Sequence, residues 1–209
     1  MESKHAQRSK ATRDKLVAAG RALFAQRGYA AVGTEEIVRA AGVTRGALYH
    51  QFRDKEDLFA AVFEAVEAET TQRVAAGALD AAATDPLGAL RAGSRRFLEV
   101  CTEPEFERIA LLDAPAVLGW ERWRAVGLRH GLGLVAGVLQ AGMEAGALAP
   151  QPVTPLAHLL IGALDEGAMY VARAPDRATA LVEVQAIMDR LIDGLAGSRP
   201  GPSAAVDDA

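Results

Sequence analysis

The 209-residue sequence has one cysteine, Cys101, and only 5% aromatic residues. A single cysteine excludes an intrachain disulfide framework and any metal site built from several cysteines, and it favours a reducing, cytoplasmic compartment. The N-terminal residues have no apolar stretch typical of a signal peptide. Residues 145–164 lack Asp, Glu, Lys and Arg, but three prolines and several polar residues interrupt them, so they do not predict a membrane span.

Catalytic motifs are also missing. The sequence has no phosphate-binding loop, dinucleotide fingerprint, zinc-binding His-Glu-x-x-His or nucleophile elbow. Its four histidines are dispersed, and the Cys101-Thr102-Glu103 cluster has no identifiable base nearby. We therefore expect a protein that is not an enzyme and that uses no cofactor and no metal.

Charge is distributed unevenly along the chain. The formal net charge is −4, yet residues 1–55 carry 11 basic and 5 acidic side chains, and all four lysines lie there. Residues 56–209 carry 12 basic and 22 acidic side chains. This asymmetry indicates a basic binding module joined to an acidic body.

Alanine is abundant and no sustained strand-type alternation occurs, so the sequence predicts an all-α fold of about nine helices. We expect a flexible basic arm at 1–9, a helix-turn-helix domain at 10–56, a helical domain at 57–196 and a disordered tail at 197–209. The first helix is expected to begin near Ala11. Helical structure is expected to be weak at 77–85. A short helix from Pro104 is expected to break or kink at 113–115.

The segment 34–52 has the layout of a helix-turn-helix. Thr34 is a candidate N-cap of a short helix, Gly42 permits a tight turn, and Thr44 is a candidate N-cap of a second helix of about two turns. Such a unit holds the second helix against a small core and leaves its N-terminal end free to enter a major groove of DNA.

The polar residues of this unit suggest separate contacts with DNA. Arg45 stands one residue past the cap, where recognition helices reach base edges, and arginine can bond bidentately to guanine. Gly46 lets the backbone approach closely. Thr34, Tyr49 and His50 are suited to phosphate contacts, which position a protein without specifying sequence.

Lys55 lies in the first turn of the next predicted helix, where a cation opposes the helix dipole. A DNA phosphate at that end would meet both the helix N-terminus and the ammonium group. The alternative is that Asp54, Glu56 or Asp57 neutralises the lysine.

These residues resemble a known family. The stretch TRDKLVAAGRALFAQRGYAAVGTEEIVRAAGVTRGALYHQFRDKEDLF is similar to the N-terminal DNA-binding domain of TetR-family transcriptional regulators. The shared pattern includes Phe24, Gly28 and Tyr29, then Ala41-Gly42-Val43, and the run from Leu48 to Leu58. The resemblance implies an all-helical homodimer, usually a repressor, whose C-terminal domain binds a small ligand. By position it places Thr44, Arg45 and Gly46 at bases, and Thr34, Tyr49, His50 and Lys55 at the backbone.

The C-terminal part predicts dimerisation through its last two helices. The first has small residues that permit close helix approach, and the second has a broad apolar face. The alternative is that both pack within one chain. The small residues are Gly162, Ala163, Gly167 and Ala168, and the apolar face is Leu181, Val184, Ile187, Met188, Leu191 and Leu195.

A pocket for an unidentified small-molecule effector is expected among the helices between residues 85 and 172, because a mostly apolar set with a few polar anchors occurs there. Each of these residues has an ordinary structural alternative, such as core packing. The candidates are Phe97, Cys101, Phe106, Leu112, Trp120, Trp123, His130, Met143, Asp165 and Met169.

The favoured function is therefore a ligand-responsive regulator that binds a palindromic operator on double-stranded DNA, with no membrane partner. Ligand binding is expected to spread the two recognition helices of the dimer, because the helix after residue 54 links the two domains. The alternative is a helical protein-interaction module without specific DNA binding.

Overall fold

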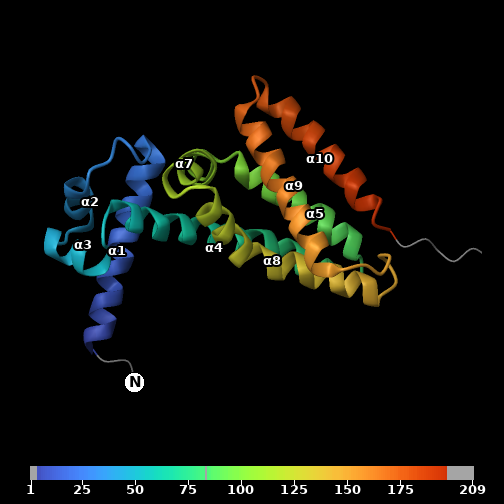
Figure 1. Ribbon diagram of the computed structural model, residues 1–209, viewed down its shortest axis with the longest axis horizontal. Coiled ribbons are helices and arrows are strands. Elements are labelled where there is room, and N and C mark those ends of the chain that lie inside the picture. Colours follow the sequence, from blue (N-terminus) through green and yellow to red (C-terminus); the bar gives the residue numbers. More distant parts are fainter. Residues whose placement is uncertain (1–3, 83, 197–209) are drawn as a thin grey trace, which may run out of the picture.

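The computed structural model describes residues 4–82 and 84–196. Those residues are almost entirely helical, which confirms the all-α prediction, and a smaller N-terminal unit precedes a larger helical body (Figure 1). In the N-terminal unit α1 contacts α2, α3 and α4. Its helices are α1 (Lys4–Arg27), α2 (Thr34–Ala41) and α3 (Arg45–Gln51).

The body consists of long helices that pack side by side. Helix α4 leaves the N-terminal unit and packs against α5 and α8, while α9 packs against both α8 and α10. These helices are α4 (Lys55–Ala82), α5 (Pro86–Cys101), α8 (Trp120–Glu144), α9 (Val153–Arg173) and α10 (Arg177–Asp193). Helix α4 therefore belongs to both parts of the molecule. It extends to Ala82 and so includes residues 77–82, which the sequence predicts to be weakly helical.

The segment between α5 and α8 differs from the prediction. Residues Pro104–Phe106 (α6), Glu107–Asp113 (η1) and Ala114–Leu118 (α7) form one continuous helical stretch whose central part is a π-helix. The stretch continues through Pro115, so the expected break does not occur, and the helix changes from π to α geometry just before this proline. With this stretch taken as one unit, the described residues form the nine helical segments that the sequence predicts.

The expected flexible arm is the second correction. Helix α1 begins at Lys4, so residues 4–9 belong to a regular helix. A tertiary contact fixes part of this extension, because the Gln51 side chain in α3 donates a hydrogen bond to Ser9 Oγ at 2.8 Å. The expected tail at 197–209 and residues 1–3 of the arm lie outside the described residues.

Three helix starts have a side-chain cap. The side chains of Thr44, Asp85 and Asp176 each accept a hydrogen bond from a backbone N–H in the first turn of the helix they cap. The predicted cap at Thr34 is wrong by one residue, because Gly33 occupies the N-cap and Thr34 is the first helical residue of α2.

One continuous hydrophobic core joins the two parts. It contains Leu16, Phe24 and Leu48 of the N-terminal unit, and it continues through α4 to residues as distant as Leu139 and Ile192. The helices of the body and those of the N-terminal unit therefore share one packed core. No helix in the described part of the chain is long and apolar enough to cross a membrane.

Candidate DNA-binding surface and ligand cavity

The turn between α2 and α3 depends on Gly42. This residue ends α2 in the left-handed conformation, with φ of 64°, and its N–H bonds back to the Arg39 carbonyl. Ile37 and Leu48 are fully buried on the inner sides of α2 and α3. The turn and this core together fix α3 with its opposite side toward solvent.

The predicted DNA-side residues of α3 share one exposed surface. Thr44, Arg45, Gly46, Tyr49 and His50 are all exposed, and only Thr34 on α2 is half-buried. The structure therefore brings together six of the seven predicted residues around the N-terminal part of α3.

Arg45 is held loosely on this surface. Its guanidinium lies 3.6 Å from Glu35 Oε1, with both side chains largely exposed, and 5.6 Å from the Tyr49 ring centroid. Arg45, with Thr34, lowers the pKa of the Tyr49 phenol. Exposed ion pairs contribute little free energy, so the arginine can exchange Glu35 for another acceptor at small cost.

Lys55 has partners that the sequence did not indicate. Its ammonium group donates to the carbonyl oxygens of Tyr29 at 3.0 Å and Val32 at 3.1 Å, and it lies 3.9 Å from the Tyr29 ring centroid. Partial burial lowers the pKa of this lysine. In the structure Lys55 holds the loop between α1 and α2 instead of pairing with Asp54, Glu56 or Asp57. Its contact with a DNA phosphate stays a prediction.

The same loop is also tied to the body. The backbone N–H of Tyr29 donates to Asp113 Oδ2 in η1 at 2.7 Å. Nearby, Arg21 of α1 bonds Glu105 of α6 through two nitrogens, at 2.9 and 2.6 Å, and Glu69 of α4 at 2.6 Å. The stretch from α6 to η1 therefore contacts the N-terminal unit through charged groups as well as through the core.

A cavity of about 100 Å³ lies inside the body between α4, α5, α8 and α9, with Ile192 of α10 on its wall. Most of its lining is apolar, and Gly93, Gly127 and Gly131 leave room where other residues would place side chains. Such a cavity fits a small molecule with few polar groups.

Two acidic residues lie on the cavity wall. Glu67 is half-buried and lines the cavity, and desolvation raises its pKa to about 8. The negative charge of Asp165 adds to this shift. Desolvation also raises the pKa of Asp165, to about 6, although its ion pair with Arg124 opposes the shift.

Of the predicted pocket residues, Phe97 and Asp165 line this cavity. The other eight do not, for identifiable reasons. Cys101 and Phe106 are buried in the core, and Trp123 donates to the Ala110 carbonyl at 2.8 Å. His130 faces Glu64, with Nε2 3.6 Å from the carboxylate. The remaining four are exposed or pack on the core outside the cavity: Leu112, Trp120, Met143 and Met169.

The sequence prediction missed the polar residues of the cavity wall, chiefly Glu67, Thr70 and Ser94. A signal was present in α4, because Glu67 and Thr70 follow Phe63 at four and seven residues and so continue its apolar stripe. Polar residues in phase with a buried stripe indicate a polar group facing the interior.

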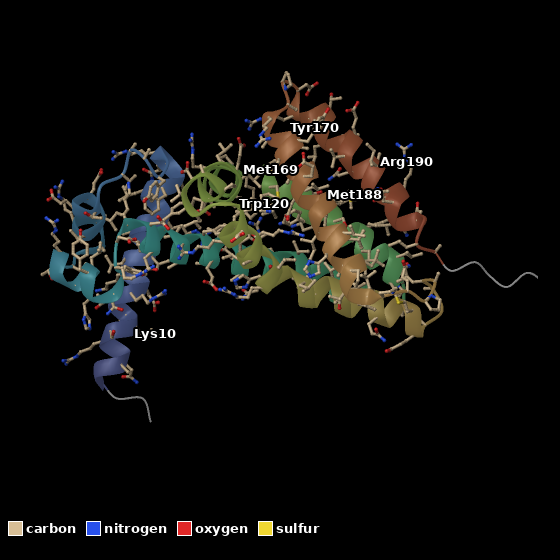
Figure 2. All side chains as sticks on the ribbon, in the orientation of Figure 1. Lys10, Trp120, Met169, Tyr170, Met188 and Arg190 are labelled. Carbon is tan, nitrogen blue, oxygen red and sulfur yellow. The ribbon has the colours of Figure 1, made fainter. Side chains whose placement is uncertain are left out.

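The last two helices divide their apolar residues between two sides. Met188 and Ile192 are buried within the chain, whereas Leu159 and Tyr170 of α9 and Ile187 and Leu191 of α10 are more than half exposed. Figure 2 shows Tyr170 and Arg190 projecting outward from this pair. The broad apolar face predicted for α10 is therefore divided between a side that packs within the chain and a side that is exposed.

The small residues of α9 serve packing within the chain. A Cβ atom at Gly167 would lie 2.8 Å from Val184 of α10, and Ala168 is buried. At Gly167, therefore, the predicted close approach of helices occurs between α9 and α10 of one chain.

Comparisons with known proteins agree with this geometry. Residues 16–62 match the family described as bacterial regulatory proteins, tetR family, and residues 87–195 match the tetracyclin repressor-like C-terminal domain. The crystal structure of a TetR-family transcriptional regulator from Pectobacterium atrosepticum is 34% identical, with 94% of this chain and 99% of that one covered and a TM-score of 0.81.

Two further proteins are similar over most of their length. The transposon Tn10 TetC protein of Escherichia coli is 28% identical over 168 residues, which span 78% of this chain and 82% of that protein. The structure of RolR in complex with resorcinol is 22% identical, covers 94% of this chain and 98% of that one, and has a TM-score of 0.72, which shows a shared fold. Because the two matched segments include the helix-turn-helix and more than half of the chain, the protein belongs to the TetR family of transcriptional regulators.

Proposed function

We propose that the protein is a repressor that binds a palindromic operator and is released when a small molecule enters the cavity of the body. The observation that carries this proposal is the exposed N-terminal part of α3, where Arg45 has only a weak ion pair and stands beside Tyr49 and His50. Arg45 contacts a base edge, while Thr34, Tyr49 and His50 contact phosphates.

Basic residues of α1 extend this surface. Arg8, Lys10, Arg13 and Lys15 are exposed, and Lys10 projects from the helix into solvent in Figure 2. Because residues 4–9 are helical, these cations contact phosphates from a fixed helix. Lys55 contributes indirectly, because it holds the loop that connects α1 to α2.

A homodimer completes the site, because a palindrome requires two α3 helices related by a two-fold axis. Leu159, Tyr170, Ile187 and Leu191 form the exposed apolar surface of α9 and α10 that would be buried between protomers. Two such helix pairs make a four-helix arrangement across the axis.

The cavity supplies the ligand response. Glu67 and Thr70 of α4 line it, while the first turn of the same helix contains Lys55, which holds the N-terminal unit. Ligand entry tilts α4 and spreads the two α3 helices beyond one helical turn of DNA. The resorcinol bound in RolR supports a small organic ligand in a protein of this fold.

Selection of bound fragments from genomic DNA tests the DNA-binding function. We expect a pseudo-palindromic site whose half-sites lie about 34–36 Å apart, with affinity that falls steeply as salt rises. Binding that showed no sequence preference and no salt dependence would instead favour the alternative, a helical protein-interaction module.

The Tyr29–Asp113 contact should stabilise the loop before α2. In Asp113→Ala, we expect amide exchange at Tyr29 to accelerate roughly tenfold to 100-fold, because hydrogen bonds to charged groups contribute about 1.5–3 kcal/mol. Operator affinity should fall with it. Asp113→Asn is the matched control, since its amide oxygen still accepts from Tyr29. Unchanged exchange in Asp113→Ala would show that η1 does not hold this loop.

A further inference from the structure

The size of the cavity limits its occupant. An apolar cavity of about 150 Å³ holds benzene, which has six non-hydrogen atoms, so a cavity of about 100 Å³ fits roughly four non-hydrogen atoms. Its wall is apolar apart from a few groups on α4, α5 and α9. The ligand is therefore a small hydrocarbon group that carries one polar end.

The carboxyl group of Glu67 has no hydrogen-bond or ion-pair partner within residues 4–82 and 84–196. Asp165 faces it from α9 and Cys101 from α5, while the hydroxyl groups of Thr70 and Ser94 line the same wall. The nearest cation on α8, Arg124, is already paired with Asp165 and donates to the His158 carbonyl. Glu67 is thus a desolvated acid that lines the cavity and has no counter-ion among the described residues.

We propose that the cavity binds a small, mostly apolar amine whose ammonium group pairs with the Glu67 carboxylate. This inference rests on the proposed ligand response. An anionic ligand would meet two acidic residues, and a neutral alcohol would exchange only a hydrogen bond with the protonated Glu67 acid, whereas an ion pair is the stronger contact. An ammonium group gives Glu67 the ion pair it lacks and can also donate to a neighbouring hydroxyl oxygen.

Binding of the amine must release a proton. With a pKa of about 8, Glu67 is mostly protonated at pH 7, whereas a free alkylamine is already an ammonium ion. Pairing converts the Glu67 acid to a carboxylate, and its proton passes to the buffer. The affinity should therefore rise about tenfold between pH 6 and pH 7 and level off above pH 8. Asp165, with a pKa of about 6, adds to the loss of affinity below pH 6.

Calorimetric titration of the full-length protein with propylamine and with 1-propanol tests this inference. Titrations at pH 7 in two buffers of different ionisation enthalpy measure the proton release directly. We expect the amine to release close to one proton per site and to bind at least tenfold more tightly than the alcohol, which should release none.

Glu67→Gln should lose at least tenfold in amine affinity, along with the proton release and the pH dependence. Glu64→Gln is the matched control on α4, because Glu64 pairs with Arg129 outside the cavity, and it should bind as the unaltered protein does. The folded state retains a proton on Glu67 from about pH 4.5 to 8, so this group lowers stability as pH rises through that range. Glu67→Gln should therefore unfold at a higher temperature than the unaltered protein at pH 8, which shows that the fold survives.

Equal or tighter binding of 1-propanol, amine binding without proton release, or no binding of either probe would each overturn the amine assignment. The regulatory proposal fails separately. If the amine binds with proton release but does not dissociate the operator complex, the ligand class stands and the ligand-responsive repressor does not. If only neutral molecules dissociate the operator complex, the ligand-responsive repressor stands and the amine assignment does not.

Discussion

Replacement of both Ile187 and Leu191 by glutamate should convert a dimer into a monomer of 22.0 kDa and lower operator affinity by roughly 100-fold or more. Both side chains are 51% exposed in the single chain, so the substitution leaves the core of the protomer intact. In the dimer each would bury its remaining half of apolar surface, worth about 0.8–1.5 kcal/mol, and a monomer reaches only one half-site.

Sedimentation velocity measures the mass, and fluorescence anisotropy with labelled operator measures the affinity. Leu112→Glu is the control, because it introduces the same acidic group at an exposed leucine outside α9 and α10. A double variant that stayed dimeric with a helical circular dichroism spectrum would move the dimer interface away from the α9–α10 surface.

Arg45→Ala should remove sequence preference. A bidentate arginine–guanine contact discriminates by about 1–3 kcal/mol, which is a loss of roughly fivefold to 150-fold for each half-site. Affinity for scrambled DNA should change far less, because phosphate contacts supply most of the non-specific binding. Anisotropy titrations with operator and scrambled duplexes give the ratio directly.

Arg53→Ala controls for the lost charge, since Arg53 follows α3, is 79% exposed and pairs only weakly with Asp57 at 3.7 Å. Its effect should be similar on both duplexes. If Arg45→Ala also weakened both duplexes equally, Arg45 would be a phosphate contact and another residue would read the base sequence.

The features that the sequence predicts well depend on neighbouring residues. Gly42 in the turn and the caps at Thr44, Asp85 and Asp176 act within three or four residues, so their physical requirements are visible in the sequence itself. The all-α class follows for the same reason, because helical periodicity is local.

The features that it predicts poorly depend on distant contacts. Arg8 to Lys10 look like a polar arm, yet the Gln51–Ser9 contact helps to hold that turn as helix. Lys55 shows no sign in the sequence that it donates to loop carbonyls more than twenty residues away. Similarly, α4 carries Glu64, Glu67 and Glu69 close together, and only the packing of α5 and α9 separates the buried acid from the exposed ones.

The helical start of α1 has a kinetic consequence. A flexible arm would keep hold of the DNA while α3 left its groove, so the repressor would remain nearby and rebind. A rigid α1 turns with the whole N-terminal unit, so the phosphate contacts of Lys10 and the base contact of Arg45 are lost in the same movement. Induction should therefore raise the dissociation rate in a single step, without an intermediate that slides along the operator.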